Sequence, residues 1–182
     1  MADFTLPFPN RELADKELTY DLCYHKIPVE SRSIIVENAW KKGAEAAHKV
    51  FDSFHGSYDF VSICSESGLK LIKKNVDYVV GGQRYFSDYI SGQKIINIYT
   101  KSVKLWADEN SFTLDTAINL ILSHEYFHFL EVNEIGLTSR MCQVPMIIIG
   151  KLRIGKTGIR ALSEIGAHAF ARTYYELVLR EE

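Results

Sequence analysis

The stretch Ser123-His124-Glu125-Tyr126-Phe127-His128 has the spacing H-E-x-x-H and lies inside a long, mostly apolar part of the sequence. Residues four apart lie on one face of an α-helix, so His124 and His128 can both point at one metal ion. Glu125 lies next to them and can reach a water molecule on that ion. This spacing is typical of zinc-assisted peptide hydrolysis, in which the glutamate is the general base.

The helix around the motif is expected to be buried, because apolar residues lie on nearly all of its sides. Thr113 can cap its start, and Asp115 in the first turn suits the helix dipole. Two imidazoles and a carboxylate are costly to bury unless they are paired or bind a metal. They can also be core histidines with Glu125 in a salt bridge, but spacing and burial together favour the metal. The apolar positions are Leu114, Ala117, Ile118, Leu120, Ile121, Leu122, Phe127, Phe129, Leu130 and Val132.

A catalytic zinc ion usually has three protein ligands and one water, so a third ligand is expected elsewhere in the chain. The metzincin pattern needs Gly and His where this chain has Glu131 and Glu134, and that class is therefore excluded. Glu131 is about 10 Å from His124 along a helix axis, so we expect it not to share the ion. Glu164 is the better candidate, because it opens a second helix that is predicted to run to about Leu179. A His-His-Glu ligand set is that of thermolysin-like enzymes.

The second helix, from Ala161, carries His168 one turn after Glu164 and on the same face. We expect His168 to orient a ligand through a hydrogen bond, although it can also stabilise charge on the substrate or replace Glu164 as ligand. The alternative for Glu164 is a carboxylate that is stabilised only by the helix dipole. Tyr174 and Tyr175 lie too far along this helix to be oxyanion donors, which leaves His168 as the nearest candidate. Small residues would let the two helices pack closely: Gly166, Ala167, Ala169 and Ala171.

Together these two segments resemble the ImmA/IrrE family of metallopeptidases, whose members carry H-E-x-x-H on one helix and E-x-x-A-N-x-F-A on a later one. The second segment here is Glu164-Ile165-Gly166-Ala167-His168-Ala169-Phe170-Ala171, with His168 where the family commonly has Asn. Many members have H-E-x-G-H, whereas Phe127 stands at the Gly position of this chain. The similarity extends over residues 60–180, and only the two motifs in it are specific.

The resemblance to this family implies His124, His128 and Glu164 as zinc ligands and Glu125 as the catalytic base. It also implies a short sheet ahead of the motif helix. Members often cleave or otherwise control a DNA-binding repressor, so the resemblance implies a protein or peptide substrate and a transcriptional regulator as one such partner.

Length and composition predict one soluble domain of 182 residues, with a helical part over 1–58, a small sheet over 59–100 and the zinc-binding helices over 111–180. The formal net charge of −2 implies no general attraction to nucleic acid. The three cysteines are far apart and form no C-x-x-C, so neither a disulfide framework nor a thiolate zinc site is indicated. No signal peptide and no apolar run of about 20 residues is present, which predicts a cytoplasmic protein without a membrane partner.

The central part of the chain is expected to supply the sheet. A helix over 32–54 capped by Ser31 is followed by a predicted strand over 59–64 and a short helix over 65–74. Further strands are predicted over 76–80, 83–90 and 94–99, with a hairpin turn at 91–93. Because a sheet edge can hold an extended substrate by main-chain pairing, Lys94–Tyr99 is predicted to have that role.

Residues 150–157 fit the phosphate-binding pattern G-x-x-x-x-G-K-T letter for letter. Such a loop normally opens a large parallel α/β domain, and too little chain follows Thr157 to build one. The favoured interpretation is a turn that joins the two zinc helices. Four cationic residues would give this turn a basic rim: Lys151, Arg153, Lys156 and Arg160.

The sequence therefore predicts an α+β, zincin-like fold in which the buried H-E-x-x-H helix packs on a second, C-terminal helix beside a small antiparallel or mixed sheet. The predicted function is zinc-dependent hydrolysis of a peptide bond, with Zn²⁺ held by His124, His128 and Glu164 and with Glu125 as base. Two alternatives stay open. One is a catalytically inactive zinc-binding interaction or regulatory module, and the less favoured one is a nucleotide-binding protein.

Overall fold

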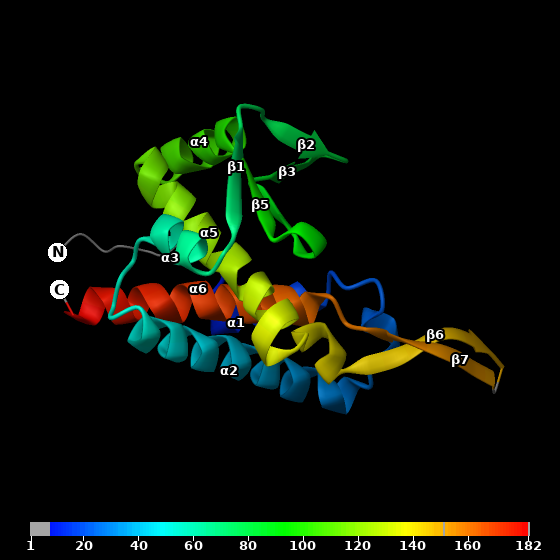
Figure 1. The fold of residues 1–182 in the computed structure, drawn as a ribbon. Coiled ribbons are helices and arrows are strands. Elements are labelled where there is room, and N and C mark those ends of the chain that lie inside the picture. The colour runs from blue at the N-terminus through cyan, green and yellow to red at the C-terminus, as the bar shows by residue number, and fades with distance from the viewer. Residues whose placement is uncertain (1–7, 151, 182) are drawn as a thin grey trace.

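The computed structural model of the protein describes residues 8–150 and 152–181, and these residues form an α+β fold. The H-E-x-x-H helix, α5 (Leu114–Leu130), lies in the middle of the molecule (Figure 1). The sheet and α4 (Thr100–Glu109) lie on one side of α5, and α2 (Val29–Ser53) and α6 (Ala161–Glu181) lie on the other. The predicted α+β class and the packing of the motif helix on a C-terminal helix are confirmed.

Two glycines allow α2, α6 and α5 to approach one another at backbone distance. A Cβ atom added to Gly43 of α2 would lie 2.1 Å from the carbonyl oxygen of Gly166 in α6. A Cβ atom added to Gly166 would lie 2.7 Å from the ring of Phe127 in α5. Any larger residue at either position would therefore push these helices apart. This close contact brings the first turns of α6 against the motif helix.

The larger sheet has three strands in the order β1 (Lys70–Lys74), β5 (Ile95–Tyr99) and β4 (Ser87–Ile90). Strand β5 pairs in parallel with β1 and antiparallel with β4. The short helical turn η2 (Ser91–Gln93) joins β4 to β5, as the predicted hairpin connection requires. A separate two-stranded hairpin is formed by β2 (Tyr78–Val80) and β3 (Gln83–Tyr85).

The prediction that Lys94–Tyr99 offers a free edge is wrong, because β5 is the central strand of this sheet. Its residues Ile96 and Ile98 are fully buried, as expected for a strand that is covered by neighbours. The strand beside α5 is β4, which is an edge strand with no further pairing partner among the described residues. The predicted strand over 83–90 is also divided, since β3 and β4 belong to different sheets.

The predictions for residues 59–74 are wrong, and a capping signal explains the difference. Helix α3 (Phe60–Glu66) replaces the predicted strand, and strand β1 occupies the second half of the predicted helix. Asp59 Oδ1 accepts hydrogen bonds from the backbone N–H groups of Val61 and Ser62, which is the geometry of a helix N-cap. The buried side chains of α3 are spaced three and four residues apart, which is helical periodicity.

Three further helices differ from the prediction. Helix α2 begins at Val29, directly after Pro28, and Ser31 therefore lies inside its first turn. Helix α1 (Arg11–Leu18) lies in the predicted helical part over 1–58 but outside its one predicted helix over 32–54, and α4 lies in a segment for which no helix was predicted. Asn10 caps α1, since its Oδ1 accepts from the backbone N–H of Leu13 at 3.1 Å. A short 3₁₀ turn, η1 (Tyr24–Lys26), leads from α1 towards α2.

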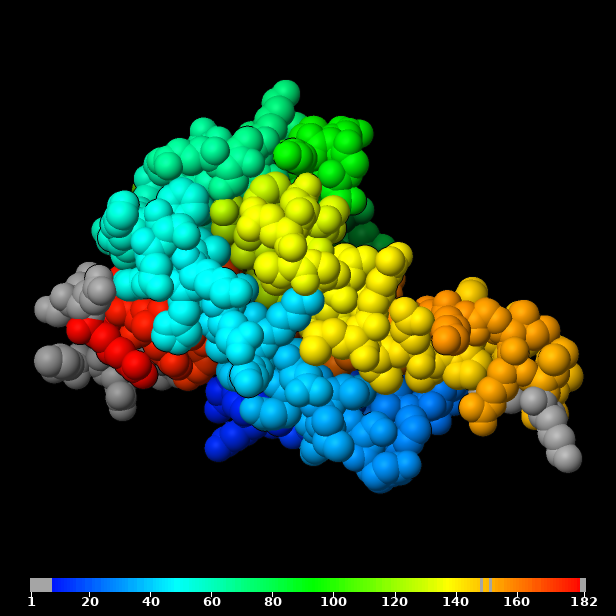
Figure 2. Space-filling view, turned by 60° about the horizontal axis from the view of Figure 1, so that its bottom comes forward, coloured from blue at the N-terminus to red at the C-terminus, as the bar shows by residue number. Residues whose placement is uncertain are grey.

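Residues 143–158 form a two-stranded arm rather than a simple turn. Strands β6 (Gln143–Ile149) and β7 (Leu152–Gly158) pair antiparallel, and the arm projects from the side of the molecule (Figures 1 and 2). The G-x-x-x-x-G-K-T segment is thus largely strand β7, whose backbone is paired with β6. A phosphate-binding loop needs free backbone N–H groups at a helix start, and this geometry does not supply them.

Helix α5 continues into a π-helical turn, η3 (Glu131–Ile135), followed by the 3₁₀ turn η4 (Thr138–Met141). Wide turns of this kind inside helices are often found at functional sites. Here the turn carries the residues just after the motif. None of the helices in the described ranges combines the length and the apolar character that a bilayer-crossing segment needs.

Candidate metal centre

Helix α5 presents the two motif histidines on one face, as predicted from their spacing. Thr113 Oγ1 accepts from the backbone N–H of Thr116 at 3.1 Å and so caps the helix as expected. Leu120, Leu122 and Phe127 are fully buried around the motif. The core therefore fixes the rotation of α5 about its own axis, and with it the direction in which the histidines point.

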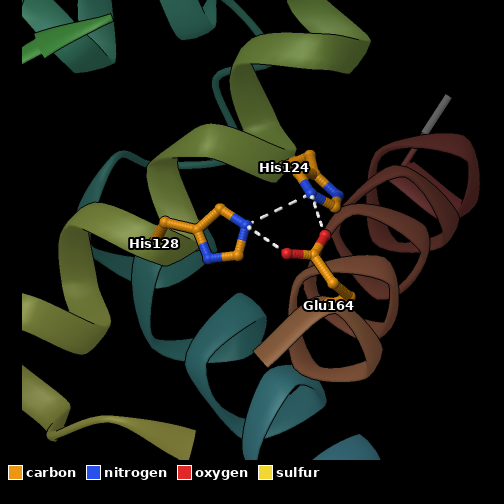
Figure 3. Close-up of side chains that lie close together, drawn as sticks. All are labelled: His124, His128 and Glu164. Carbon is orange, nitrogen blue, oxygen red and sulfur yellow. Dashed lines mark hydrogen bonds and ion pairs between the residues drawn. The ribbon is translucent and has the colours of Figure 1, made fainter. Parts of the chain in front are cut away.

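Glu164 of α6 faces His124 and His128 of α5 across the helix contact (Figure 3). The two Nε2 atoms lie 3.3 Å apart. Glu164 Oε2 lies 3.3 Å from His124 Nε2, and Glu164 Oε1 lies 3.7 Å from His128 Nε2. Ligand atoms that are each about 2.0–2.1 Å from a tetrahedral zinc ion are separated by roughly 3.3 Å. One ligand atom from each of the three groups lies within 4.8 Å of the others, which is close enough for them to hold one metal ion.

The position of Glu164 follows from the way α6 begins. Asp21 Oδ2 accepts from the backbone N–H of Ala161 at 3.0 Å and so fixes the first turn of α6. Glu164 follows one turn later, with its side chain 47% exposed. Burial opposes ionisation of this carboxyl group, but the hydrogen bond to His124 and the nearby imidazoles lower its pKa well below the usual range. The carboxylate is therefore ionised and available to a cation.

Glu131 is a functional candidate that the sequence analysis missed. It is 2% exposed and, as predicted, it is not one of the three clustered ligand candidates. Its Oε2 lies 3.1 Å from His128 Nδ1, and it also accepts hydrogen bonds from Ser163 Oγ and from the backbone N–H of Thr138. Metal-bound histidines usually donate their second N–H to such a carboxylate. The sequence feature that could have identified Glu131 is its position three residues after His128, on the same helical face.

A Glu131→Gln protein is expected to bind zinc about 10–100-fold more weakly than the unchanged protein. The amide keeps the shape of the side chain but removes the negative charge that holds His128 Nδ1 protonated and Nε2 free. Competition with a chromogenic chelator measures the affinity. The matched control is Glu134→Gln, an exposed position on the same π-helical turn, which should leave the affinity unchanged. Equal affinities in both variants would contradict the orienting role of Glu131.

The charge around the two histidines favours a cation. Burial lowers the pKa of His128, but the hydrogen bond to Glu131 and the charges of Glu164, Glu125 and Glu131 outweigh burial and raise this pKa to about 9. Burial raises the pKa of Glu131, and its hydrogen bonds with His128, Ser163 and Thr138 lower it to below the usual value. Without a metal, a proton on His128 therefore balances the surrounding carboxylates.

This proton gives the zinc affinity a defined pH dependence. Zinc needs a neutral imidazole, so binding must displace the proton from His128, and the affinity should rise about tenfold per pH unit below pH 9 for each proton released. Calorimetric titrations in buffers of different ionisation enthalpy count the protons directly. We expect at least one proton released per zinc at about pH 7. Binding without proton release would contradict the charge balance described above.

Glu125, the predicted base, is 7% exposed and accepts a hydrogen bond from Ser87 Oγ of β4 at 2.5 Å. Glu125, His124 and His168 line one cavity of about 290 Å³, and Ser87 lies at its wall. Glu164 instead faces a second cavity, which it shares with Glu17 of α1. His124 and Glu164 therefore line different cavities. No local feature of the sequence places Ser87 at this site, because β4 reaches α5 only through the tertiary fold.

His168 lies beside the cluster but is not in it. Its ring centroid is 5.1 Å from that of His124, and no hydrogen bond to the three ligand candidates is found for it in the described part of the chain. The prediction that it orients a ligand therefore has no bond to support it. Burial and the adjacent His124 lower the pKa of His168 to about 3, so its ring is neutral near pH 7. A neutral imidazole at the cavity wall can donate one N–H to a bound molecule.

The predicted exclusion of Tyr174 agrees with the geometry. Tyr174 is fully buried on the far part of α6, where its hydroxyl donates to the carbonyl of Ser57. No protein-family model, curated protein or solved structure matches the chain. The case for a function therefore rests on the arrangement of the side chains themselves.

Proposed function

We propose that the protein is a zincin-like, zinc-dependent metallopeptidase. The observation that carries this proposal is the convergence of His124, His128 and Glu164, whose ligand atoms lie within 4.8 Å of one another, next to the buried carboxylate of Glu125. A zinc ion bound by these three residues would lower the pKa of a water molecule towards about 7 and would polarise a scissile carbonyl group.

Glu125 is placed to accept a proton at the mouth of the cavity and to pass it to the leaving amine. Its hydrogen bond with Ser87 holds one carboxylate oxygen, which leaves the other oxygen for the reacting proton. His168, neutral and at the wall of the same cavity, is placed to donate an N–H to the oxyanion that forms on the substrate carbonyl. Each of these roles needs only an atom that already faces the cavity.

An extended peptide substrate would lie along β4. This strand is an edge strand among the described residues, and it carries Ser87 within hydrogen-bonding distance of Glu125. Main-chain pairing with such an edge fixes a peptide without regard to most of its side chains. The family resemblance adds a transcriptional regulator as the candidate protein that supplies the peptide.

Metal analysis combined with a hydrolysis assay tests the proposal. Protein purified without added metal should contain about one zinc per chain, and a His124→Ala variant should contain close to none. The loaded protein should cleave a quenched-fluorescence peptide library, and cleavage should stop on chelation and return with zinc. A zinc-containing protein that cleaves no peptide or protein would favour the catalytically inactive zinc module instead.

A further inference from the structure

The described chain begins with a segment that lies across the candidate site. The ring of Phe8 is 6.3 Å from the ring of His124, between centroids, and the two planes differ by 10°. The same ring is 6.3 Å from that of His168 and 6.4 Å from that of Trp106. Phe8 therefore stands beside one metal-ligand candidate and beside the imidazole placed to contact the substrate.

The segment at Phe8 is held against the body of the protein. The ring of Phe8 packs against the main hydrophobic core. The carbonyl oxygen of Phe8 accepts a hydrogen bond from Arg172 Nη1 of α6 at 3.3 Å. Phe8 is half-buried and belongs to no helix or strand. Its ring is thus fixed at the site by side-chain packing and one main-chain hydrogen bond.

The cavity that Phe8 lines has an apolar, largely aromatic side. Its volume of about 290 Å³ is near the lower limit of ligand cavities, about 300 Å³. Phe8, Phe86, Trp106 and Ile121 are among its apolar lining residues. Glu125 lies at the same cavity. A large apolar side chain placed here would therefore bring its own main chain close to the proposed base.

We propose that this cavity binds an aromatic side chain of the substrate next to the bond that is cleaved, and that the ring of Phe8 at its wall contacts that side chain. This inference rests on the proposed peptidase function, because it assumes that the protein cleaves a peptide bond of the substrate. Two features favour an aromatic occupant. The wall is itself aromatic, so that offset or edge-to-face contacts are available. Phe8 at this wall is also an aromatic residue, and its ring lies beside that of Trp106.

Peptide binding can be measured separately from hydrolysis. The Glu125→Gln protein, loaded with zinc, provides a form that does not consume its ligand. The chain has two tryptophans, and a Trp40→Phe change leaves Trp106 at the cavity wall as the only fluorescent reporter. The two probes are acetyl-Ala-Ala-Phe-Ala-amide and the same peptide with Ala in place of Phe.

We expect the phenylalanine peptide to bind roughly tenfold or more tightly than the alanine peptide, because it buries one more aromatic ring. Phe8→Ala should weaken binding of the phenylalanine peptide several-fold, because the bound ring loses a contact at the wall, and should leave the alanine peptide unchanged. Phe8→Leu, which keeps an apolar contact and protects folding, should give an intermediate value. Leu13→Ala, an exposed change on α1, should alter neither affinity.

Two results would overturn the inference. Equal affinities for the two peptides would show that the cavity does not select an aromatic ring. Unchanged or tighter binding of the phenylalanine peptide by Phe8→Ala would show that the bound ring does not contact Phe8 at the wall of this cavity. If the peptides bind as expected but the unchanged protein cleaves neither, the peptidase proposal fails while the cavity assignment stands. Cleavage of both peptides at equal rates would support the peptidase proposal and overturn the cavity assignment.

Discussion

A Glu125→Gln protein is expected to keep its zinc and to lose about 10²–10⁴-fold in kcat for peptide hydrolysis. The amide has nearly the shape of the carboxylate and can still accept the hydrogen bond from Ser87 Oγ. It has no basic oxygen, however, and cannot take a proton from water at neutral pH. Steady-state rates on a fluorogenic peptide, beside zinc content by elemental analysis, measure both parts of the expectation.

The comparison with Glu134→Gln makes this result specific. Glu134 lies on the turn after α5 and is exposed. The Glu134→Gln protein should therefore have unchanged zinc content and unchanged kcat. Equal activity in Glu125→Gln and the unchanged protein would rule out Glu125 as the base. Loss of zinc from Glu125→Gln would instead assign it a structural role in the metal centre.

Gly43→Ala is expected to have the largest effect on stability and to reach the metal centre indirectly. The new methyl carbon would lie 2.1 Å from the carbonyl oxygen of Gly166, which belongs to backbone that cannot move alone. Overpacking of this kind typically costs about 1–3 kcal/mol, and each kcal/mol lowers Tm by about 2–4 °C in a chain of this size. Because α6 must move away, Glu164 should also leave the two histidines, and zinc affinity should fall.

Thermal unfolding and zinc titration of the same preparations check this prediction. Gly92→Ala is the matched control, because a Cβ atom at Gly92 meets nothing within 4 Å. That variant should show the Tm and the zinc affinity of the unchanged protein. A Gly43→Ala protein with both values unchanged would mean that the helices can separate without affecting the site.

The metal-centre candidates could be predicted from the sequence because their signals are local. The spacing of His124 and His128 defines one helical face, and Glu164 opens a helix whose apolar pattern is regular. Glu131 could have been placed in the same way, since it follows His128 by one turn. Ser87 and Phe8 could not, because only the folded chain brings β4 and the segment before α1 to α5.

The sheet was harder to predict than the helices for a related physical reason. Strand order depends on pairing between distant segments, so nothing within Lys94–Tyr99 distinguishes a central strand from an edge. The segment 59–74 is short, and its apolar residues fit both periods until the Asp59 cap is considered. Residues near 150–157 match a nucleotide-binding pattern in letters, whereas their backbone is paired as a strand.

The base of the β6–β7 arm is closed by the pairing of Gln143 with Gly158. Next to it, the N–H of Ile159 donates to the carbonyl of Ser139 at 2.9 Å. The chain thus leaves the body and returns to it at one fixed point between the two ligand-bearing helices. The length and composition of the arm are consequently uncoupled from the distance between His128 and Glu164. Substitutions, insertions and deletions in the arm can therefore accumulate during evolution without changing the positions of the metal-ligand candidates.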